Sequence, residues 1–268
     1  MIDPRRRLRR GLPMRALAPN AITALALCFG LTAIRFAISE EWERAIGAIV
    51  IAAFLDGMDG RVARLIRGES RFGAELDSLS DVIAFGVSPA IVSYLWSLKH
   101  YPQAGWIFAL SHAVCCALRL ARFNTMAADG GEKDKTEFTG FPIPAAAGLI
   151  ASITFFMLWW FGEKEHDIGR WKWVLPPLMI FLSVMMFTRL RYPSFKAITW
   201  RTTRSLPRFA AIILILFFTA LNYEWMPAIL FLTYLLYGFL RPWVSKRWRR
   251  EIEEEIGEES ENGEAIEL

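Results

Sequence analysis

The sequence contains little cysteine and little histidine, with three residues of each among 268. Cys28, Cys115 and Cys116 all fall in apolar stretches, so we expect neither a disulfide framework nor a cysteine-based metal site. Internal repeats and nucleic-acid-binding motifs are also absent from the sequence. The net charge of +4 therefore does not indicate a nucleic-acid partner, and we attribute the basic excess to lipid phosphates and membrane topology.

Apolar residues make up 54% of the chain, and its mean hydropathy is +0.30. A soluble domain in which 22% of residues are charged does not reach this hydropathy unless charged and apolar residues are segregated. Apolar stretches, each close to the length that about 30 Å of hydrocarbon requires, occur near 20–38, 45–66, 77–98, 105–123, 142–161, 173–187, 209–221 and 225–240. We therefore expect an all-α integral membrane protein with about eight transmembrane helices.

The basic residues predict how these helices are oriented. With an even number of helices, 25 of the 31 Lys and Arg residues fall on one side, which the positive-inside rule assigns to the cytoplasm. Both termini are then cytoplasmic, and we expect a bacterial inner-membrane protein. We expect no cleavable signal peptide, because no small-residue cleavage site follows the first apolar run and Arg35 interrupts that run.

Three segments follow from this pattern. Residues 1–19 form a basic juxtamembrane segment, which could lie as an interfacial helix on anionic lipid or act as a solvated arm that only sets topology. We expect residues 20–241 to form the transmembrane domain, which carries the candidate catalytic residues described below. Residues 242–268 form a charged cytoplasmic tail, which we expect to be disordered because it holds nine glutamates and no basic residue from Glu251 onward.

Four aspartates, Asp56, Asp59, Asp77 and Asp81, interrupt two of the apolar stretches. An ionisable group at membrane depth destabilises insertion by roughly 3 kcal/mol even on mild scales, and is retained mostly where it lines a polar cavity, pairs or binds an ion. A transporter or channel could use such acids as a cation or proton path, but it would need polar residues along its full depth. Here the acids lie towards the ends of the stretches that adjoin the basic loops, so we expect a polar active site that faces the cytoplasm.

Helical periodicity predicts that these carboxylates meet. Asp56 and Asp59 are three residues apart on one helix face, and Asp77 and Asp81 are four residues apart on a face of the next helix. In an antiparallel helix pair, Asp56 lies level with Asp81 and Asp59 lies level with Asp77. The same faces carry small residues that leave room for a helix or a ligand to approach, namely Gly60, Ala63 and Gly73. A cluster of carboxylate oxygens without histidine or cysteine suits Mg²⁺ or Mn²⁺ rather than zinc or copper.

The order of these residues forms a recognisable string: Asp56-Gly-Met-Asp59-Gly60-Arg-Val-Ala63-Arg64, then Gly73, Asp77 and Asp81. It resembles the signature of the CDP-alcohol phosphatidyltransferase family at every fixed position. The resemblance implies transfer of a phosphatidyl group from CDP-diacylglycerol to an alcohol, assisted by Mg²⁺ or Mn²⁺, with two ions expected. It also leads us to expect association with membrane lipids and a homodimer.

The resemblance assigns roles to individual residues. Asp56, Asp59 and Asp77 would hold the metal, and Asp81 would act as the general base and touch the second ion, although spacing alone does not distinguish Asp81 from Asp77. The expected CDP-diacylglycerol contacts are Asn20, Thr23, Gly60, Arg64 and Ser70. Each polar member has a simpler explanation as well: Asn20 and Thr23 as a polar helix start, Ser70 as a loop serine, and Arg64 as the partner of one aspartate.

Three further blocks are similar to the phosphatidylserine synthase branch of this family. They are Asp77-Ser-Leu-Ser-Asp81 with Phe85-Gly-x-x-Pro89-Ala, Arg119-Leu-Ala-Arg122-Phe-Asn124, and Gly140-Phe-Pro-Ile-Pro144. The similarity implies that L-serine is the acceptor and that phosphatidylserine and CMP are the products. Phe141 stands where that branch is expected to have leucine, and the C-terminal third matches in hydropathy alone.

The acceptor site is expected to include Arg119, Arg122 and Asn124. A guanidinium can bind the carboxylate of serine through two hydrogen bonds, so a fixed arginine beside the aspartates would orient this acceptor. The alternative is that both arginines extend to the membrane surface and only set topology. Other acceptors also remain open: glycerol 3-phosphate, inositol phosphate, choline, or serine on an archaeal-type lipid backbone.

Overall fold

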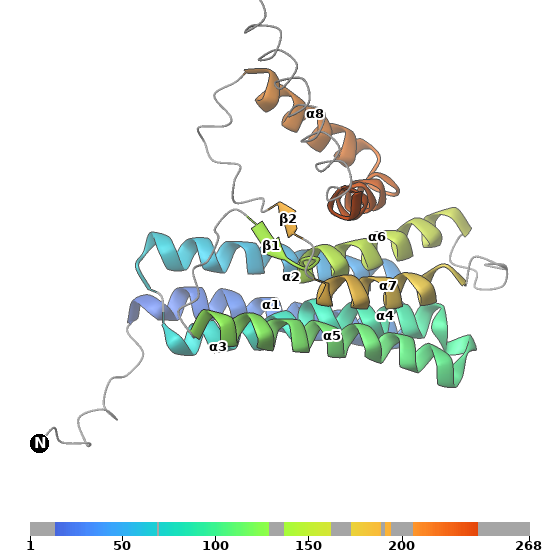
Figure 1. Cartoon of the computed structure of the whole chain (residues 1–268), viewed down its shortest axis with the longest axis horizontal. Coiled ribbons are helices and arrows are strands. Elements are labelled where there is room, and N and C mark those ends of the chain that lie inside the picture. The colour runs from blue at the N-terminus through green and yellow to red at the C-terminus, as the bar shows by residue number, and fades with distance from the viewer. Residues whose placement is uncertain are drawn as a thin grey trace, which may run out of the picture.

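The computed structural model describes residues 14–68, 70–128, 137–161, 173–188, 191–193 and 206–240, and these are mostly helical (Figure 1). The longer helices are α1 (Met14–Ile38), α2 (Trp42–Leu65), α3 (Arg71–Asp81), α4 (Ser88–Trp96), α5 (Pro102–Ala128), α6 (Ile143–Phe161), α7 (Leu175–Phe187), α8 (Leu206–Leu221) and a last helix, Met226–Leu240. A π-helical segment (Val82–Val87) joins α3 to α4, and a 3₁₀ turn (Leu98–His100) precedes α5. Two three-residue strands, β1 (Glu137–Thr139) and β2 (Arg191–Pro193), pair antiparallel.

Four of the helical stretches are long and apolar enough to cross a membrane: Leu17–Ile38, Arg71–Trp96, Gln103–Thr125 and Ile143–Phe161. Two shorter apolar helices are Leu175–Phe187 and Met226–Leu240. The expectation of a helical integral membrane protein is therefore confirmed. The count of eight spans stays a prediction, since α2 and α8 are not among these stretches.

Helices α1 to α5 form the bundle that carries the acidic residues, and they run side by side in Figure 1, with α8 steeply inclined to them. Helix α1 contacts α2, α3 and α4. Small residues let the backbones approach: a Cβ added to Gly30 would lie 3.0 Å from Ala84 Cα, and one added to Gly86 would lie 3.1 Å from Cys116 Sγ. Such close packing stabilises helix pairs in lipid, where the hydrophobic effect between helices is weak.

The helical run from α3 to α4 passes through Pro89 without a break. Proline lacks the backbone N–H that would bond the carbonyl of Phe85 in an α-helical register, and the π-helical segment ends two residues before Pro89. Ser88 Oγ lies 2.8 Å from the carbonyl oxygens of Gly30 and Ile83, so the serine ties this run to α1. Near this proline, a side-chain hydroxyl thus contacts one carbonyl of its own helical run and one of a neighbouring helix, as is common around proline in membrane helices.

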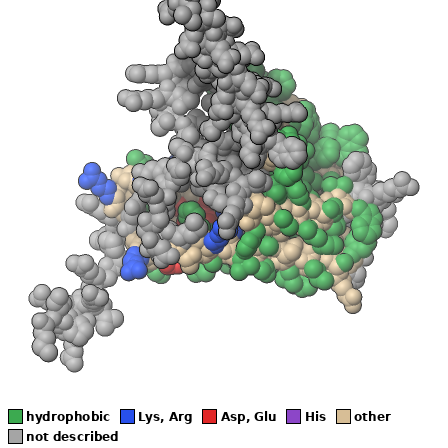
Figure 2. All heavy atoms as spheres, in the orientation of Figure 1, with side chains coloured by type: hydrophobic (Ala, Val, Ile, Leu, Met, Phe, Trp, Pro, Cys, Tyr) green, Lys and Arg blue, Asp and Glu red, His purple; other side chains and the backbone are tan. Residues whose placement is uncertain are grey.

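Polar side chains gather at one end of the bundle, where α1 and α3 begin and α2 and α5 end. Figure 2 shows the visible Lys, Arg, Asp and Glu side chains towards this end, while hydrophobic side chains cover the described surface away from it. At the same end, Thr23 of α1 bonds Asp59 of α2, and Asn124 of α5 bonds Ser78 of α3. These contacts bring residues from four helices into one polar region.

Candidate active site

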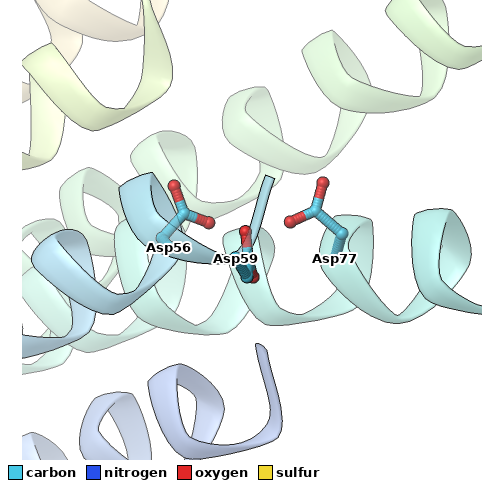
Figure 3. A group of neighbouring side chains, drawn as sticks. All are labelled: Asp56, Asp59 and Asp77. Atoms are coloured by element: carbon cyan, nitrogen blue, oxygen red, sulfur yellow. The ribbon is translucent and has the colours of Figure 1, made fainter. Parts of the chain in front are cut away.

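Three of the four aspartates point towards a common centre. Helix α2 supplies Asp56 and Asp59, and α3 supplies Asp77 (Figure 3). One carboxylate oxygen from each lies within 4.8 Å of the others. Three acceptor oxygens at this separation repel one another strongly unless a cation or a proton lies between them.

Asp81 adjoins this group, one helical turn after Asp77. The carboxyl groups of Asp81 and Asp56 lie within hydrogen-bond reach of each other, as their level positions in the sequence predict. Asp81 Oδ1 is buried and has no hydrogen-bond partner among the described residues. A buried carboxylate oxygen without a donor requires a ligand, a cation or a proton. The cluster and its unpartnered oxygen therefore fit an oxygen-bound divalent ion such as Mg²⁺ or Mn²⁺.

Thr23 orients one member of the cluster from α1. Its Oγ1 lies 2.6 Å from Asp59 Oδ2 and 3.0 Å from the Pro19 carbonyl oxygen, and both Thr23 and Asp59 are buried. A hydroxyl has a single hydrogen, so it donates to the carboxylate or to the carbonyl at a given moment. Ser80 Oγ donates to the Thr23 carbonyl at 3.3 Å. Thr23 was expected as a nucleotide contact or as part of a polar helix start, and spacing gave no signal for its bond to Asp59.

Asn20, Ser70 and Gly73 meet where α3 begins. Ser70 caps the helix, its Oγ accepting a 3.0 Å hydrogen bond from the Gly73 N–H. A Cβ added to Gly73 would lie 2.6 Å from Asn20 Oδ1 and 3.0 Å from Ser70 Oγ. Glycine is thus required for Asn20 to keep this position, which places two of the expected nucleotide contacts next to each other.

Arg64 is exposed, and its Nε donates a 3.0 Å hydrogen bond to the carbonyl of Gly60 in its own helix. Within the described part of the chain, no ion pair joins Arg64 to an aspartate. The structure therefore does not contain the simple neutralising pair that was the alternative explanation for this arginine.

The three expected acceptor residues all lie on α5, but they differ in how near they are to the aspartate cluster. Arg119 is half-buried and lies within electrostatic range of Asp81. Asn124 Nδ2 donates a 2.9 Å hydrogen bond to Ser78 Oγ, next to Asp77. The Arg122 side chain is exposed on the surface of α5.

Tyr234, in the last helix, is a residue that the sequence did not single out. It lies within electrostatic range of Arg119, and its ring packs against Phe141 with the ring centroids 5.7 Å apart. No motif marks this tyrosine, because its position depends on how the last helix packs on the segment before α6. Its neighbour Leu235 is buried, which fixes this part of the helix against the bundle.

Comparison with known proteins bears directly on this arrangement. Residues 16–186 match the family model for CDP-alcohol phosphatidyltransferase. The chain belongs to the CDP-alcohol phosphatidyltransferase family. The resemblance inferred from the sequence is thereby confirmed, and the matched region contains every residue expected in the site.

Three proteins similar to this chain carry related enzyme names. The chain is 46% identical over 159 residues to the CDP-diacylglycerol–serine O-phosphatidyltransferase of Mycobacterium tuberculosis (strain ATCC 25618 / H37Rv), an alignment that covers 57% of this chain and 55% of that protein. It is 34% identical over 230 residues to the protein of the same name from Helicobacter pylori (strain ATCC 700392 / 26695), an alignment that covers 84% of this chain and 90% of that protein. It is 33% identical over 180 residues to the archaetidylserine synthase of Methanothermobacter thermautotrophicus, covering 65% and 69%. The alignment thus spans about half the length of the mycobacterial relative.

Proposed function

We propose that the protein transfers the phosphatidyl group of CDP-diacylglycerol to L-serine and releases CMP. The observation that carries this proposal is the group of carboxylates from α2 and α3, with one buried oxygen of Asp81 left without a partner. Membership of the family supports the phosphatidyl transfer. The names of relatives from Mycobacterium and Helicobacter support serine as the acceptor.

We propose that Asp56, Asp59 and Asp77 hold one or two Mg²⁺ or Mn²⁺ ions. Bound there, divalent ions would neutralise negative charge on the phosphoryl oxygens and favour departure of CMP. The chain's own contribution is to keep the ligands in position. Thr23 does so for Asp59, because a hydrogen bond to one oxygen of a carboxylate fixes where the other oxygen points.

Asp81 is proposed as the general base. A serine hydroxyl is a poor nucleophile near neutral pH, so a positioned carboxylate has to remove its proton as the oxygen attacks. The serine oxygen then forms a bond to the phosphatidyl phosphorus, the bond from that phosphorus to the CMP oxygen breaks, and the proton passes to Asp81. The unpartnered Oδ1 of Asp81 supports this role, because no donor among the described residues occupies that oxygen and it is free to accept a proton.

We propose that CMP is held by the N-terminal part of α1, the C-terminal part of α2 and the turn before α3, through the residues expected from the sequence: Asn20, Thr23, Gly60, Arg64 and Ser70. The contact of Asn20 with Gly73 and the capping bond of Ser70 support a preformed site at this corner. The exposed guanidinium of Arg64 is available to a phosphate. The diacylglycerol chains would stay among the lipids beside the bundle.

The direct test is to incubate the purified protein with labelled CDP-diacylglycerol and single acceptors, and to separate the lipid products. L-Serine should give phosphatidylserine, whereas glycerol 3-phosphate, inositol phosphate and choline should give little product. An archaeal-type nucleotide lipid with serine should be included, because one relative is named archaetidylserine synthase. Preferential use of another alcohol would show that serine is not the acceptor. If no alcohol received the phosphatidyl group, the proposed transferase activity itself would be wrong.

For serine selection we propose Arg119, Arg122 and Asn124, with Arg119 as the main contact. Arg119→Lys keeps the positive charge but loses the planar pair of donors, so the serine KM should rise about tenfold, the equivalent of one charge-assisted hydrogen bond. The KM for CDP-diacylglycerol should change little. Steady-state kinetics with each substrate varied in turn measures both values.

Arg122→Lys is the matched comparison, because Arg122 is on the same helix and is exposed. Its serine KM should rise less than that of Arg119→Lys. An unchanged serine KM in Arg122→Lys would mean that Arg122 only sets topology. If both variants had the serine KM of the wild type, neither arginine would belong to the acceptor site.

We further propose eight transmembrane helices in a bacterial inner membrane, with the active site and both termini in the cytoplasm, and a homodimeric assembly. The gathering of charged side chains at the aspartate end of the bundle supports the orientation. A reporter fused after Leu268 should therefore show cytoplasmic activity. A second reporter inserted after Phe161, between α6 and α7, should report the opposite side, and periplasmic activity of the first fusion in an active protein would refute the even-numbered topology.

A further inference from the structure

His112 is a fully buried polar residue that the proposed mechanism does not use. It lies on α5, is 0% exposed, and its Nε2 is 3.2 Å from the carbonyl oxygen of Phe85. A carbonyl oxygen can only accept, so Nε2 carries the hydrogen. Nδ1 then has no hydrogen-bond partner among the described residues. A buried histidine that makes one bond to a backbone group is unusual enough to require a reason.

The reason lies in the position of the carbonyl it bonds. In an α-helix the carbonyl of residue 85 accepts from the N–H of residue 89, but residue 89 is a proline and has no N–H. Phe85 itself is buried at 1% exposure. His112 therefore gives this buried carbonyl a donor from a neighbouring helix, one turn before a proline that has no N–H of its own to offer.

This carbonyl belongs to the π-helical segment that begins directly after Asp81. The N–H of Ser88 bonds the carbonyl of Ile83, five residues back rather than four. A π-helical turn holds one residue more than an α-helical turn, so it rotates the residues before it about the helix axis relative to those after it. The direction in which Asp77 and Asp81 point, relative to the buried part of α4, therefore depends on this segment being present.

The face of α5 that carries His112 continues along the same segment to the aspartates. Cys116, four residues on, packs against Gly86. Arg119, seven residues on, lies within electrostatic range of Asp81. Residues at three successive turns of α5 thus face the segment that runs from Gly86 back to Asp81.

We infer that His112 is a positioning residue for the active site: its hydrogen bond to the Phe85 carbonyl holds the π-helical segment that turns Asp77 and Asp81 towards Asp56 and Asp59. The inference rests on the proposed function for its effect on catalysis. Its structural part, the stabilisation of residues 82–90 by His112, holds whatever the reaction.

Three substitutions separate the hydrogen bond from the volume of the side chain. His112→Gln places an amide N–H near the position of Nε2, His112→Asn carries the same amide on a shorter side chain, and His112→Met keeps volume without a donor. Because a displacement of about 1 Å in a reacting group can lower a rate about 10²-fold, the Asn and Met variants should lose kcat on that scale with little change in either KM. The Gln variant should recover most of the activity.

Amide hydrogen exchange over residues 82–90 is the second measurement, and it does not depend on any activity. Exchange should be faster in the Asn and Met variants than in wild type and near normal in the Gln variant. Thr154→Val is the matched control, because Thr154 is also buried but its hydroxyl bonds the Ile150 carbonyl of its own helix at 2.8 Å. It should leave kcat and the exchange of residues 82–90 unchanged.

The outcomes distinguish the two proposals. Wild-type protein that makes no phosphatidylserine would reject the proposed function, while faster exchange in the Asn and Met variants would still support the role of His112. An active His112→Met variant with normal exchange would mean that His112 only fills space and would overturn the inference. Equal exchange in all variants would overturn it as well.

Discussion

Asp81→Asn should reduce kcat by about 10²–10⁴-fold, the range that a positioned general base contributes. The amide has nearly the same shape as the carboxylate but cannot accept the proton of the serine hydroxyl. Because Asp56, Asp59 and Asp77 remain, the variant should still bind divalent ions and most of the CDP-diacylglycerol. Single-turnover kinetics with labelled CDP-diacylglycerol, together with a direct measurement of lipid binding, separates turnover from binding.

Glu75→Gln is the control for this experiment. Glu75 is an exposed acid on the same helix, α3, so its substitution removes one negative charge without touching the carboxylate cluster. Its kcat should match that of wild type. If Asp81→Asn kept substantial activity, the base would have to be another residue, and Asp77 would be tested next because spacing alone does not separate the two.

Asp59→Ala should lose divalent-ion binding and catalysis together. Asp59 is 4% exposed, and one of its carboxylate oxygens lies in the group formed with Asp56 and Asp77 that could hold a metal ion. Alanine therefore removes one metal ligand, which water replaces only in part. The affinity for Mn²⁺ should fall by more than the roughly 10–100-fold that loss of a supporting hydrogen bond produces. Asp56→Ala should behave in the same way. Mn²⁺ titration followed by electron paramagnetic resonance measures the affinity in purified protein, and a chelator should silence the wild-type enzyme.

Two variants calibrate this result. Thr23→Val removes the hydroxyl that lies 2.6 Å from Asp59 Oδ2 and should weaken Mn²⁺ binding by the smaller, roughly 10–100-fold amount. Glu43→Gln changes an exposed acid in the first turn of α2, away from the cluster, and should have no effect. Mn²⁺ affinity that is unchanged in both alanine variants would exclude the aspartate group as the metal site.

Helical periodicity was sufficient to predict the meeting of Asp56 with Asp81, and the gathering of Asp59 with Asp77. Both pairs depend only on the regular repeat of two neighbouring helices and a short turn between them, which the sequence specifies locally. The apolar stretches likewise correspond to helices in the structure, because length and hydropathy are local properties. The functional roles of these residues stay predictions.

Other features depend on packing that no local pattern encodes. One such feature is the π-helical segment that ends two residues before Pro89, and another is the contact of His112, on α5, with the Phe85 carbonyl. Tyr234 reaches the surroundings of Arg119 only through the way the last helix packs. Contacts of this kind depend on the angles between helices, which follow from many side chains together rather than from the spacing of a few.

The hydrogen bond between Thr23 and Asp59 also bears on how such a protein is made. Membrane helices leave the ribosome in order, and the N-terminal part of a chain folds first. The donor on α1 is therefore already synthesised when the carboxylates of α2 follow, and α3 comes next with the rest of the cluster. The aspartates, which are the residues least compatible with lipid, thus emerge next to the helices that hold their partners, well before α6 to α8 exist. Biogenesis would need to shield these acids from the bilayer only for the short interval between neighbouring helices.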